Sequence, residues 1–293
     1  MAVVAARTRR TVPAPAARRR RRDPVRHLVL AGLLVLVLLM VAPLLVVALN
    51  AVKSPAEYAA NGPLALPRHL YLSGIVDFWK RVNFGRVLLN SLVISGAVAL
   101  LGVLVAVLNA YALGIGKVPG RILFLIFFLL ANLLPQETLV YPLFYLAKLV
   151  HLYNTQLAVI IIFTVIQGAF GTYLLASVFD GFPQALLDAA AVDGAGRWRT
   201  LWRVVVPVSR PSLAVLLTFF FIWTWNEFFL PLIFLISNDK QTVPVALSVL
   251  QGDKLMDVTT TSSSALIGIL PAVLFFLLFQ RTLTRGILAG SVK

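Results

Sequence analysis

The sequence has no cysteine and little charge, and both absences restrict what the protein can be. Without cysteine there is no disulfide framework, no thiol catalysis and no Cys-based metal site. The three histidines, His27, His69 and His151, show no metal-ligand spacing, and no HExxH motif or nucleophile elbow is present. Only 13% of the 293 residues are charged, 60% are hydrophobic, and the mean hydropathy is +0.91. This composition indicates an integral membrane protein.

Six apolar windows are each long enough to cross about 30 Å of hydrocarbon as a helix. They run from Leu28 to Leu49, Val87 to Leu113, Ile122 to Leu146, Leu157 to Phe179, Ser212 to Ile236 and Ala265 to Leu283. The sequence therefore predicts an all-α, polytopic membrane protein with six transmembrane helices. We find no internal repeat of the kind that many secondary transporters have.

Basic residues are concentrated before the first apolar window. Nine of the 26 Lys and Arg residues lie there, in a chain of net charge +15. Such a charge would suit nucleic-acid binding. Its position directly before a span, however, is in the first place a topology signal, which places the N-terminus in the cytoplasm. Six spans then place the C-terminus there too, with 18 basic residues inside against 8 outside, although Lys80, Arg81 and Arg86, just before the second span, run against the rule. A cleavable signal peptide is disfavoured, because no small-x-small cleavage site follows Asn50.

The spans and the charge pattern predict the organisation of the chain. Residues 1–27 form a basic, disordered cytoplasmic tail that contacts anionic lipid. The first transmembrane helix at 28–50 is followed by an extracytoplasmic segment at 51–86, with a short interfacial helix. Residues 87–283 contain the other five spans and a cytoplasmic loop at 180–211, and residues 284–293 form a cytoplasmic tail.

The cytoplasmic loop contains a polar segment, DAAAVDGAGRWRTLWRVVVPVSRP, from Asp188 to Pro211. A helix is expected to start at Pro183 and to break at Gly194, where a side chain would crowd the bend. A second helix would end before Pro207. The apolar positions on one face of this second helix are Trp198, Leu201, Trp202 and Val205. From these residues alone, a docking element for a soluble partner and an amphipathic loop seated in the headgroups are equally consistent.

The order acidic-Ala-Ala, then Asp-Gly-Ala, then an apolar-Pro step resembles the cytoplasmic "EAA" loop of ATP-binding-cassette (ABC) importer permeases. In that family the loop docks into a cleft of the ATPase subunit. The resemblance implies this coupling role for Asp188, Ala189, Ala190, Asp193, Gly194, Ala195 and Pro207. The family usually has Glu at the first position, and Asp188 keeps the charge with a reach about one methylene shorter.

The resemblance covers nearly the whole chain and is greatest to the second permease of carbohydrate systems. It implies a type I importer permease in a bacterial cell membrane, with a core formed by the five spans after the first. The implied partners are a homologous second permease, an ATPase dimer that holds ATP and Mg, an extracytoplasmic solute-binding protein and membrane lipid. No cofactor on this chain and no nucleic acid are expected. The C-terminal FQRTLTRGILAGSVK also resembles the end of sugar-type permeases.

Glu227 is a candidate for the substrate path, because an ionisable group inside a span is costly and usually faces a cavity or a partner. The alternative is a structural carboxylate hydrogen-bonded to Asn226, Trp223, Trp225 or a neighbouring span. In the third span, Asn132, Gln136 and Glu137 flank Pro135. These residues either line the same path or satisfy backbone groups that the proline frees.

Other polar and aromatic side chains in the spans offer contacts to a sugar. Gln167 and Tyr173 in the fourth span could hydrogen-bond a substrate or simply join helices. The aromatic run from Phe219 to Trp225 could stack on a sugar ring or form an interfacial belt. The candidate pore residues are Glu227, Asn226, Gln167, Tyr173 and Asn132.

The segment from Ser237 to Ser264 is expected to be an extracytoplasmic loop, either simply solvated or, as in sugar permeases, reaching into the solute-binding protein. Two other function classes remain. One is a membrane enzyme with a catalytic carboxylate at Glu227 or Glu137, for which no second acid, base or nucleophile is obviously placed. The other is a secondary transporter.

Overall fold

In the described part of the chain every regular element is a helix, which confirms the predicted fold class. The computed structural model describes residues 24–116, 118–252 and 258–291. The chain divides into two units, residues 1–45 and 46–293, and each is described by itself. Most of the expected basic tail, residues 1–23, and the final residues 292–293 lie outside the described residues.

The first unit contains most of α1 (Pro24–Ala51), which is apolar around its whole circumference. Its large side chains are exposed, with Leu28 at 78% and Met40 at 69%. A helix satisfies its own backbone hydrogen bonds, so one with apolar side chains on every side suits hydrocarbon rather than water.

Three further unbroken helices, all in the second unit, are long and apolar enough to cross a membrane. They are α4 (Phe84–Ala110), which continues as a π-helical turn (Tyr111–Ile115), α7 (Gln156–Asp180) and α14 (Val258–Ser291). Two bent pairs also qualify: α5 (Arg121–Leu133) meets α6 (Gln136–Leu149) at 96°, and the run Arg197–Val208 meets α11 (Arg210–Asn226) at 79°. The described residues thus hold four unbroken candidate spans, or six if each bent pair is one span.

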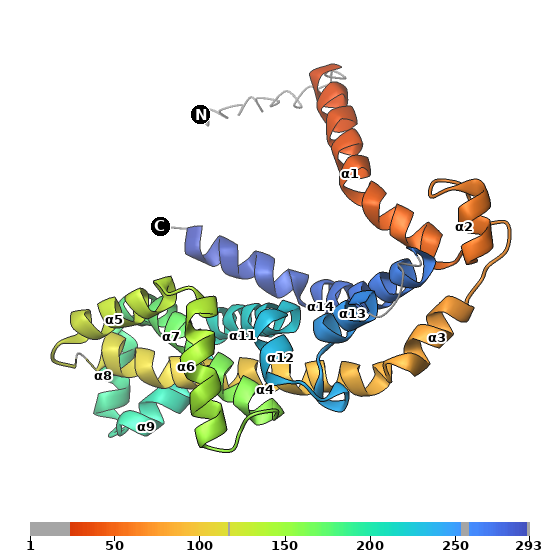
Figure 1. The fold of residues 1–293 in the computed structure, drawn as a ribbon. Helices are drawn as coiled ribbons and strands as arrows, with labels where there is room; N and C mark the ends of the chain where they lie inside the picture. The colour runs from red at the N-terminus through yellow and green to blue at the C-terminus, as the bar shows by residue number, and fades with distance from the viewer. Residues whose placement is uncertain (1–23, 117, 253–257, 292–293) are drawn as a thin grey trace, which may run out of the picture. The chain divides into compact units, whose positions relative to one another are not determined.

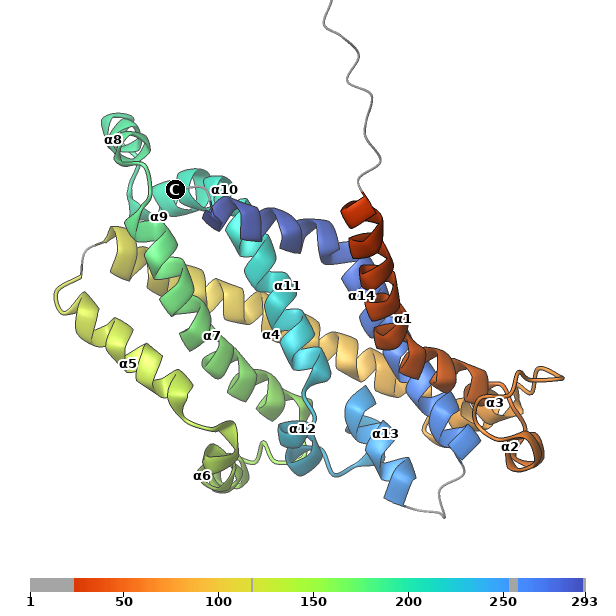
Figure 2. The same ribbon diagram turned by 90° about the horizontal axis from the view of Figure 1, so that it is seen from above.

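Shorter helices lie at the two ends of the second unit (Figure 1, Figure 2). One end carries α8 (Gln184–Val192), α9 (Arg197–Thr200), a π-helical turn (Leu201–Val205) and α10 (Val206–Val208). The opposite end carries α6, α12 (Phe229–Phe234) and α13 (Val243–Gly252). Two helices of the expected extracytoplasmic segment, α2 (Pro55–Asn61) and α3 (Ser73–Arg81), precede α4.

The centre of this unit is α4, which packs against both α7 and α11 and crosses them obliquely (Figure 2). Glycines on α4 and α7 allow the close approach. A Cβ atom on Gly102 would lie 3.0 Å from the Phe220 ring, and one on Gly171 would lie 2.8 Å from both Ala106 and Phe220. Phe220 itself is fully buried. Small residues are how membrane helices gain van der Waals contact where water supplies no driving force between them.

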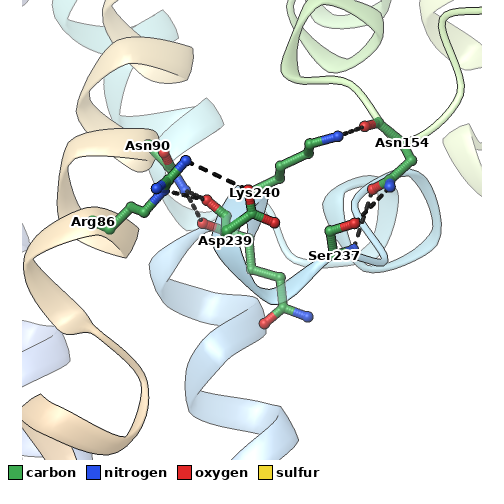
Figure 3. Close-up of polar contacts among 7 residues, drawn as sticks. Arg86, Asn90, Asn154, Ser237, Asp239 and Lys240 are labelled. Carbon is green, nitrogen blue, oxygen red and sulfur yellow. Dashed lines mark hydrogen bonds and ion pairs between the residues drawn. The ribbon is translucent and has the colours of Figure 1, made fainter.

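Polar contacts fix the segment between α12 and α13 onto two other elements (Figure 3). The Nδ2 atom of Asn90, on α4, donates to the carbonyl oxygen of Asp239 at 2.9 Å. Lys240 Nζ donates to the carbonyl oxygen of Asn154, before α7, at 2.8 Å, and Asn154 Nδ2 donates to Ser237 Oγ at 2.7 Å. The ends of α4, α7 and α12 are therefore tied together here.

The expectation of a loop from Ser237 to Ser264 is largely wrong. The segment contains α13 and the first turns of α14, which begins at Val258. The run of Ser and Thr resembles a loop in sequence, but Ser263 Oγ donates to the Thr259 carbonyl at 2.9 Å, one helical turn back. Only 253–257, which include Asp253, Lys254 and Asp257, lie outside the described residues here.

The glycine packing predicts a stability difference between two matched substitutions. Gly171→Ala places a methyl group 2.8 Å from two buried side chains and should destabilise the protein by about 1 to 3 kcal/mol. Gly96 lies on α4, and a Cβ there would have nothing within 4 Å, so Gly96→Ala should not destabilise the protein. The measurement is the fraction of detergent-solubilised protein that remains monodisperse after heating. Equal thermal loss in both variants would contradict the packing described here.

Candidate functional site

A cavity of about 510 Å³ opens where the corner between α5 and α6 faces α7 and the end of α11. Its polar lining comes from Asn132, Gln136, Glu137 and Glu227, and its aromatic lining from Trp223 and Phe229. Two acids, two amides and an indole face thus share one space.

Glu227 lies at a break in the expected fifth span. α11 ends at Asn226, Glu227 has an extended backbone with ψ 129°, and α12 begins at Phe229. The Oε1 atom of Glu227 accepts from the Phe229 N–H at 3.2 Å. A carboxylate at this position satisfies one of the unpaired N–H groups that every helix start leaves and interacts favourably with the helix dipole. The partner of Glu227 is therefore the backbone of α12, and its side chain still lines the cavity.

The opposite wall of the cavity is the corner at Leu134 and Pro135, where the expected third span turns by 96° instead of continuing straight. Asn132 Nδ2 donates to the Phe128 carbonyl at 2.7 Å. The side chain therefore bonds the backbone of its own helix and also lines the cavity. Proline prevents continuation of the helix, and non-helical backbone at membrane depth is tolerated where it borders a cavity.

Trp223 projects into the cavity wall from an aromatic cluster. Its ring lies 5.8 Å from that of Phe170 and 5.6 Å from that of Phe219, measured between centroids. The sequence places Trp223 within an aromatic run but gives no signal that separates it from Trp225, which is 4% exposed and packs in the core. Only the fold distinguishes the two indoles.

Three of the predicted pore residues do not line this cavity. Gln167 is fully buried between α7 and α11, where its Nε2 donates to Thr224 Oγ1 at 2.8 Å. It joins two helices here, which is one of the two roles that the sequence leaves open for it. Tyr173 is 40% exposed on the surface of α7. The exposed Asn226 donates to the Ile222 carbonyl of its own helix at 2.8 Å.

The cytoplasmic loop of the sequence prediction begins with α8, which ends at a tight turn on Gly194. The N–H of Ala195 donates to the Ala190 carbonyl at 2.9 Å, and the N–H of Gly194 to the Ala191 carbonyl at 3.0 Å. With Gly194 at φ 68°, this is a Schellman cap. A Cβ on Gly194 would meet nothing within 4 Å, so the expectation that a side chain would crowd the bend is wrong. Glycine is favoured here by the left-handed backbone.

Beyond this turn the chain packs into the bundle. Leu201 is 2% exposed and Val205 is fully buried, in one cluster with side chains of α4, α7 and α11. Trp198 and Trp202 are 67% and 44% exposed, so the predicted apolar face is divided between core and surface. Helical backbone also continues through Pro207 to Val208, beyond the expected end.

Two contacts connect the start and the middle of the loop to other helices. The side chains of Arg121, at the start of α5, and Asp180, the last residue of α7, form an ion pair at 2.7 Å. Tyr111 Oη donates to the Arg197 carbonyl at 3.1 Å. This hydrogen bond joins the π-helical turn that follows α4 to the start of α9. The first half of the loop is more accessible: Asp188, Ala189 and Asp193 are exposed.

Nothing in the described residues suggests a metal centre, because no three His, Cys, Asp or Glu side chains lie together in them. The two candidate sites are the polar cavity and the exposed turn after α8, which lie at opposite ends of the same helices.

Comparison with known proteins shows what the chain is similar to. Residues 33–287 match the family described as "Binding-protein-dependent transport system inner membrane component". The permease protein NgcG of the diacetylchitobiose uptake system of Streptomyces coelicolor is 26% identical over 257 residues, 87% of this chain and 85% of NgcG. The permease protein AraQ of the arabinooligosaccharides transport system of Halalkalibacterium halodurans is 30% identical over 264 residues, 86% of this chain and 91% of AraQ.

A solved structure shares the fold. A chain in the crystal structure of a bacterial ABC transporter involved in the import of the acidic polysaccharide alginate superposes with a TM-score of 0.75 at 20% identity. The match covers 92% of this chain and 99% of that one.

Proposed function

Because this chain belongs to the family of binding-protein-dependent transport system inner membrane components, we propose that it forms half of the pore of an ATP-driven sugar importer. It is a multi-pass inner membrane permease subunit, and ATP hydrolysis takes place on a separate ATPase subunit. Permeases of this family carry no cofactor of their own, and they work with an ATPase and a binding protein.

The observation that carries the coupling proposal is the two-part structure of the 188–211 loop. Its first part presents the exposed Asp188, Ala189 and Asp193 before the Gly194 turn, as a surface for the ATPase. Its second part, from Ala195 through Pro207, inserts Leu201 and Val205 into the core of α4, α7 and α11. Movement of the docked part would then move the pore helices, because packed helices shift as bodies rather than deform.

We propose that the cavity is part of the substrate path. A flat indole at Trp223 suits the apolar face of a sugar ring, and Asn132, Glu137 and Glu227 suit its hydroxyl groups. Tyr173 and Asn226 are exposed outside this cavity and are accessible to the homologous second permease that completes the pore. Gln167 acts as a positioning residue that holds α11 against α7.

A sugar, and in particular an oligosaccharide, is the substrate class supported by the names of the relatives. NgcG and AraQ are named for the uptake of diacetylchitobiose and arabinooligosaccharides, respectively. We further propose that both termini lie in the cytoplasm, because the basic N-terminal residues precede α1. The end of the helix bundle that carries α8, α9 and α10 then faces the ATPase. The opposite end, with α6, α12 and α13, faces the binding protein.

Backbone strain at Gly194 provides a test of coupling with a matched control. Gly194→Val forces a β-branched residue to φ 68°, at a cost of about 1 to 2 kcal/mol, and should uncouple sugar uptake from ATP hydrolysis. Gly196→Val, at φ −67° with nothing within 4 Å, should retain uptake. Asp188→Lys should lose uptake through charge reversal. Normal uptake and normal co-purification of the ATPase in both Gly194→Val and Asp188→Lys would refute the coupling assignment.

The two features of Glu227, its hydrogen bond and its charge, are separable by substitution. Glu227→Gln keeps an acceptor for the Phe229 N–H and should retain partial uptake. Glu227→Leu keeps the volume but loses the acceptor and the polar lining, and should abolish uptake while the complex still inserts. Uptake of labelled oligosaccharide is normalised to assembled complex in the membrane. A fully active Glu227→Leu complex would show that this residue neither lines the path nor gates it.

Single cysteines test the topology without background, because the chain has none of its own. A cysteine at Arg199 should be protected from a membrane-impermeant maleimide in intact cells. One at Asp239, whose side chain is 51% exposed at the other end of the bundle, should be labelled. The reverse pattern would place the α8 turn outside the cell and remove the coupling proposal.

A further inference from the structure

The segment between α2 and α4 carries apolar side chains that the chain leaves uncovered. Leu64, Leu66 and Leu70 are 75%, 76% and 74% exposed. Later in the same segment, Leu72, Val76 and Trp79 are 53%, 46% and 46% exposed. Single exposed apolar residues are normal, but several in succession mark an interaction surface.

A buried lysine holds this segment in a fixed conformation. Lys53 is 1% exposed, and its Nζ donates to Asn50 Oδ1 at 2.9 Å, to the Gly62 carbonyl at 3.0 Å and to the Pro63 carbonyl at 3.1 Å. Three amide oxygens thus satisfy the three donors of one buried ammonium group. Because burial of a charge is costly, this arrangement indicates that the position of the Gly62–Pro63 turn matters.

The rest of the segment is anchored as well. The Tyr71 N–H donates to the Val52 carbonyl at 2.9 Å, and the Arg68 N–H to Glu57 Oε1 at 2.6 Å. The leucines therefore project from a loop that is held at both ends by hydrogen bonds. An ordered loop that exposes leucine is preorganised for an apolar environment, since water would favour their burial.

The helix that follows, α3, is amphipathic. On its inner side Phe78 is 1% exposed and packs on Phe84 at a centroid distance of 5.5 Å. Trp79 also packs on Phe84, at 5.0 Å between centroids, but is 46% exposed. Lys80 and Arg81, in the last turn, and Asp77 are exposed as well. An indole beside basic residues on the outer face of a short helix is typical of helices in the headgroup region of a membrane.

We propose that residues 62–81 form a preformed lipid anchor at the leaflet where α4 begins. Leu64, Leu66 and Leu70 insert among the acyl chains, Trp79 lies at the headgroup level, and Lys80 and Arg81 bind the phosphates of anionic phospholipids. Charge complementarity favours lipid over a protein occupant: the exposed charges of this segment, Arg68, Asp77, Lys80 and Arg81, are net positive, and anionic headgroups border the hydrocarbon. This also gives a reason for basic residues on the side of the membrane where the charge rule disfavours them.

Spin labels on single cysteines test the proposal in the assembled transporter, reconstituted in bilayers of phosphatidylcholine with phosphatidylglycerol. Labels at Leu66→Cys and Leu70→Cys should collide more with oxygen than with a water-soluble nickel complex. A label at Asn238→Cys, exposed and polar, should show the opposite preference. Preferential collision with nickel at positions 66 and 70 would place the loop in water, and exclusion of both reagents would show that a protein covers it. Either result would overturn the proposal.

The charges are tested in the same assay. Lys80→Gln combined with Arg81→Gln should make the label at position 70 shallower in bilayers that contain phosphatidylglycerol, to the depth that the unsubstituted chain shows in phosphatidylcholine alone. An unchanged depth would contradict headgroup binding by these residues. Lys53→Met should increase the mobility of the label at position 66 and leave that at 238 unchanged. Equal mobility at position 66 would contradict the role of Lys53. Since none of these readouts depends on substrate or coupling, they remain valid if the sugar assignment fails.

Discussion

The close approach of α4, α7 and α11 is the contact on which the other features of this permease depend. It requires glycine at Gly102 and Gly171, because the Phe220 ring occupies the space that a Cβ would take. The buried hydrogen bond from Gln167 to Thr224 crosses the same interface. The coupling loop inserts Leu201 and Val205 at one end of these helices, and the polar cavity opens beside α7 and α11 toward the other. Both candidate sites therefore share one packed body.

Breaks in the helices give the cavity its polar groups. The corner at Pro135 and the interruption at Glu227 both leave backbone groups without helical partners, and each break borders the cavity. Glu227 satisfies part of this deficit by accepting from the Phe229 N–H, whereas Asn132 bonds the Phe128 carbonyl within α5. Membrane proteins tolerate irregular backbone only where protein or a cavity surrounds it, so the breaks and the cavity are one feature.

Apolar length was enough to predict the fold class and the four unbroken candidate spans, and the glycine itself was enough to predict the turn at Gly194. The sequence does not report which way a side chain faces. It therefore leaves two roles open for Gln167, which joins two helices, and it does not distinguish Trp223 from the buried Trp225. Two expectations from the sequence were wrong. Ser263 lies inside α14 with its hydroxyl bonded one turn back, where the sequence predicts a loop, and the helical run continues through Pro207.

The central claim is that this chain is one half of a pore that a separate ATPase drives. Native mass spectrometry of the complex, purified from its host through a tag on this chain, tests the claim directly. The account predicts an assembly with one copy of this chain, one copy of a homologous permease and a dimer of ATP-hydrolysing subunits. A chain that purifies alone, or as a homodimer without an ATPase under conditions that preserve its transport activity, would contradict it.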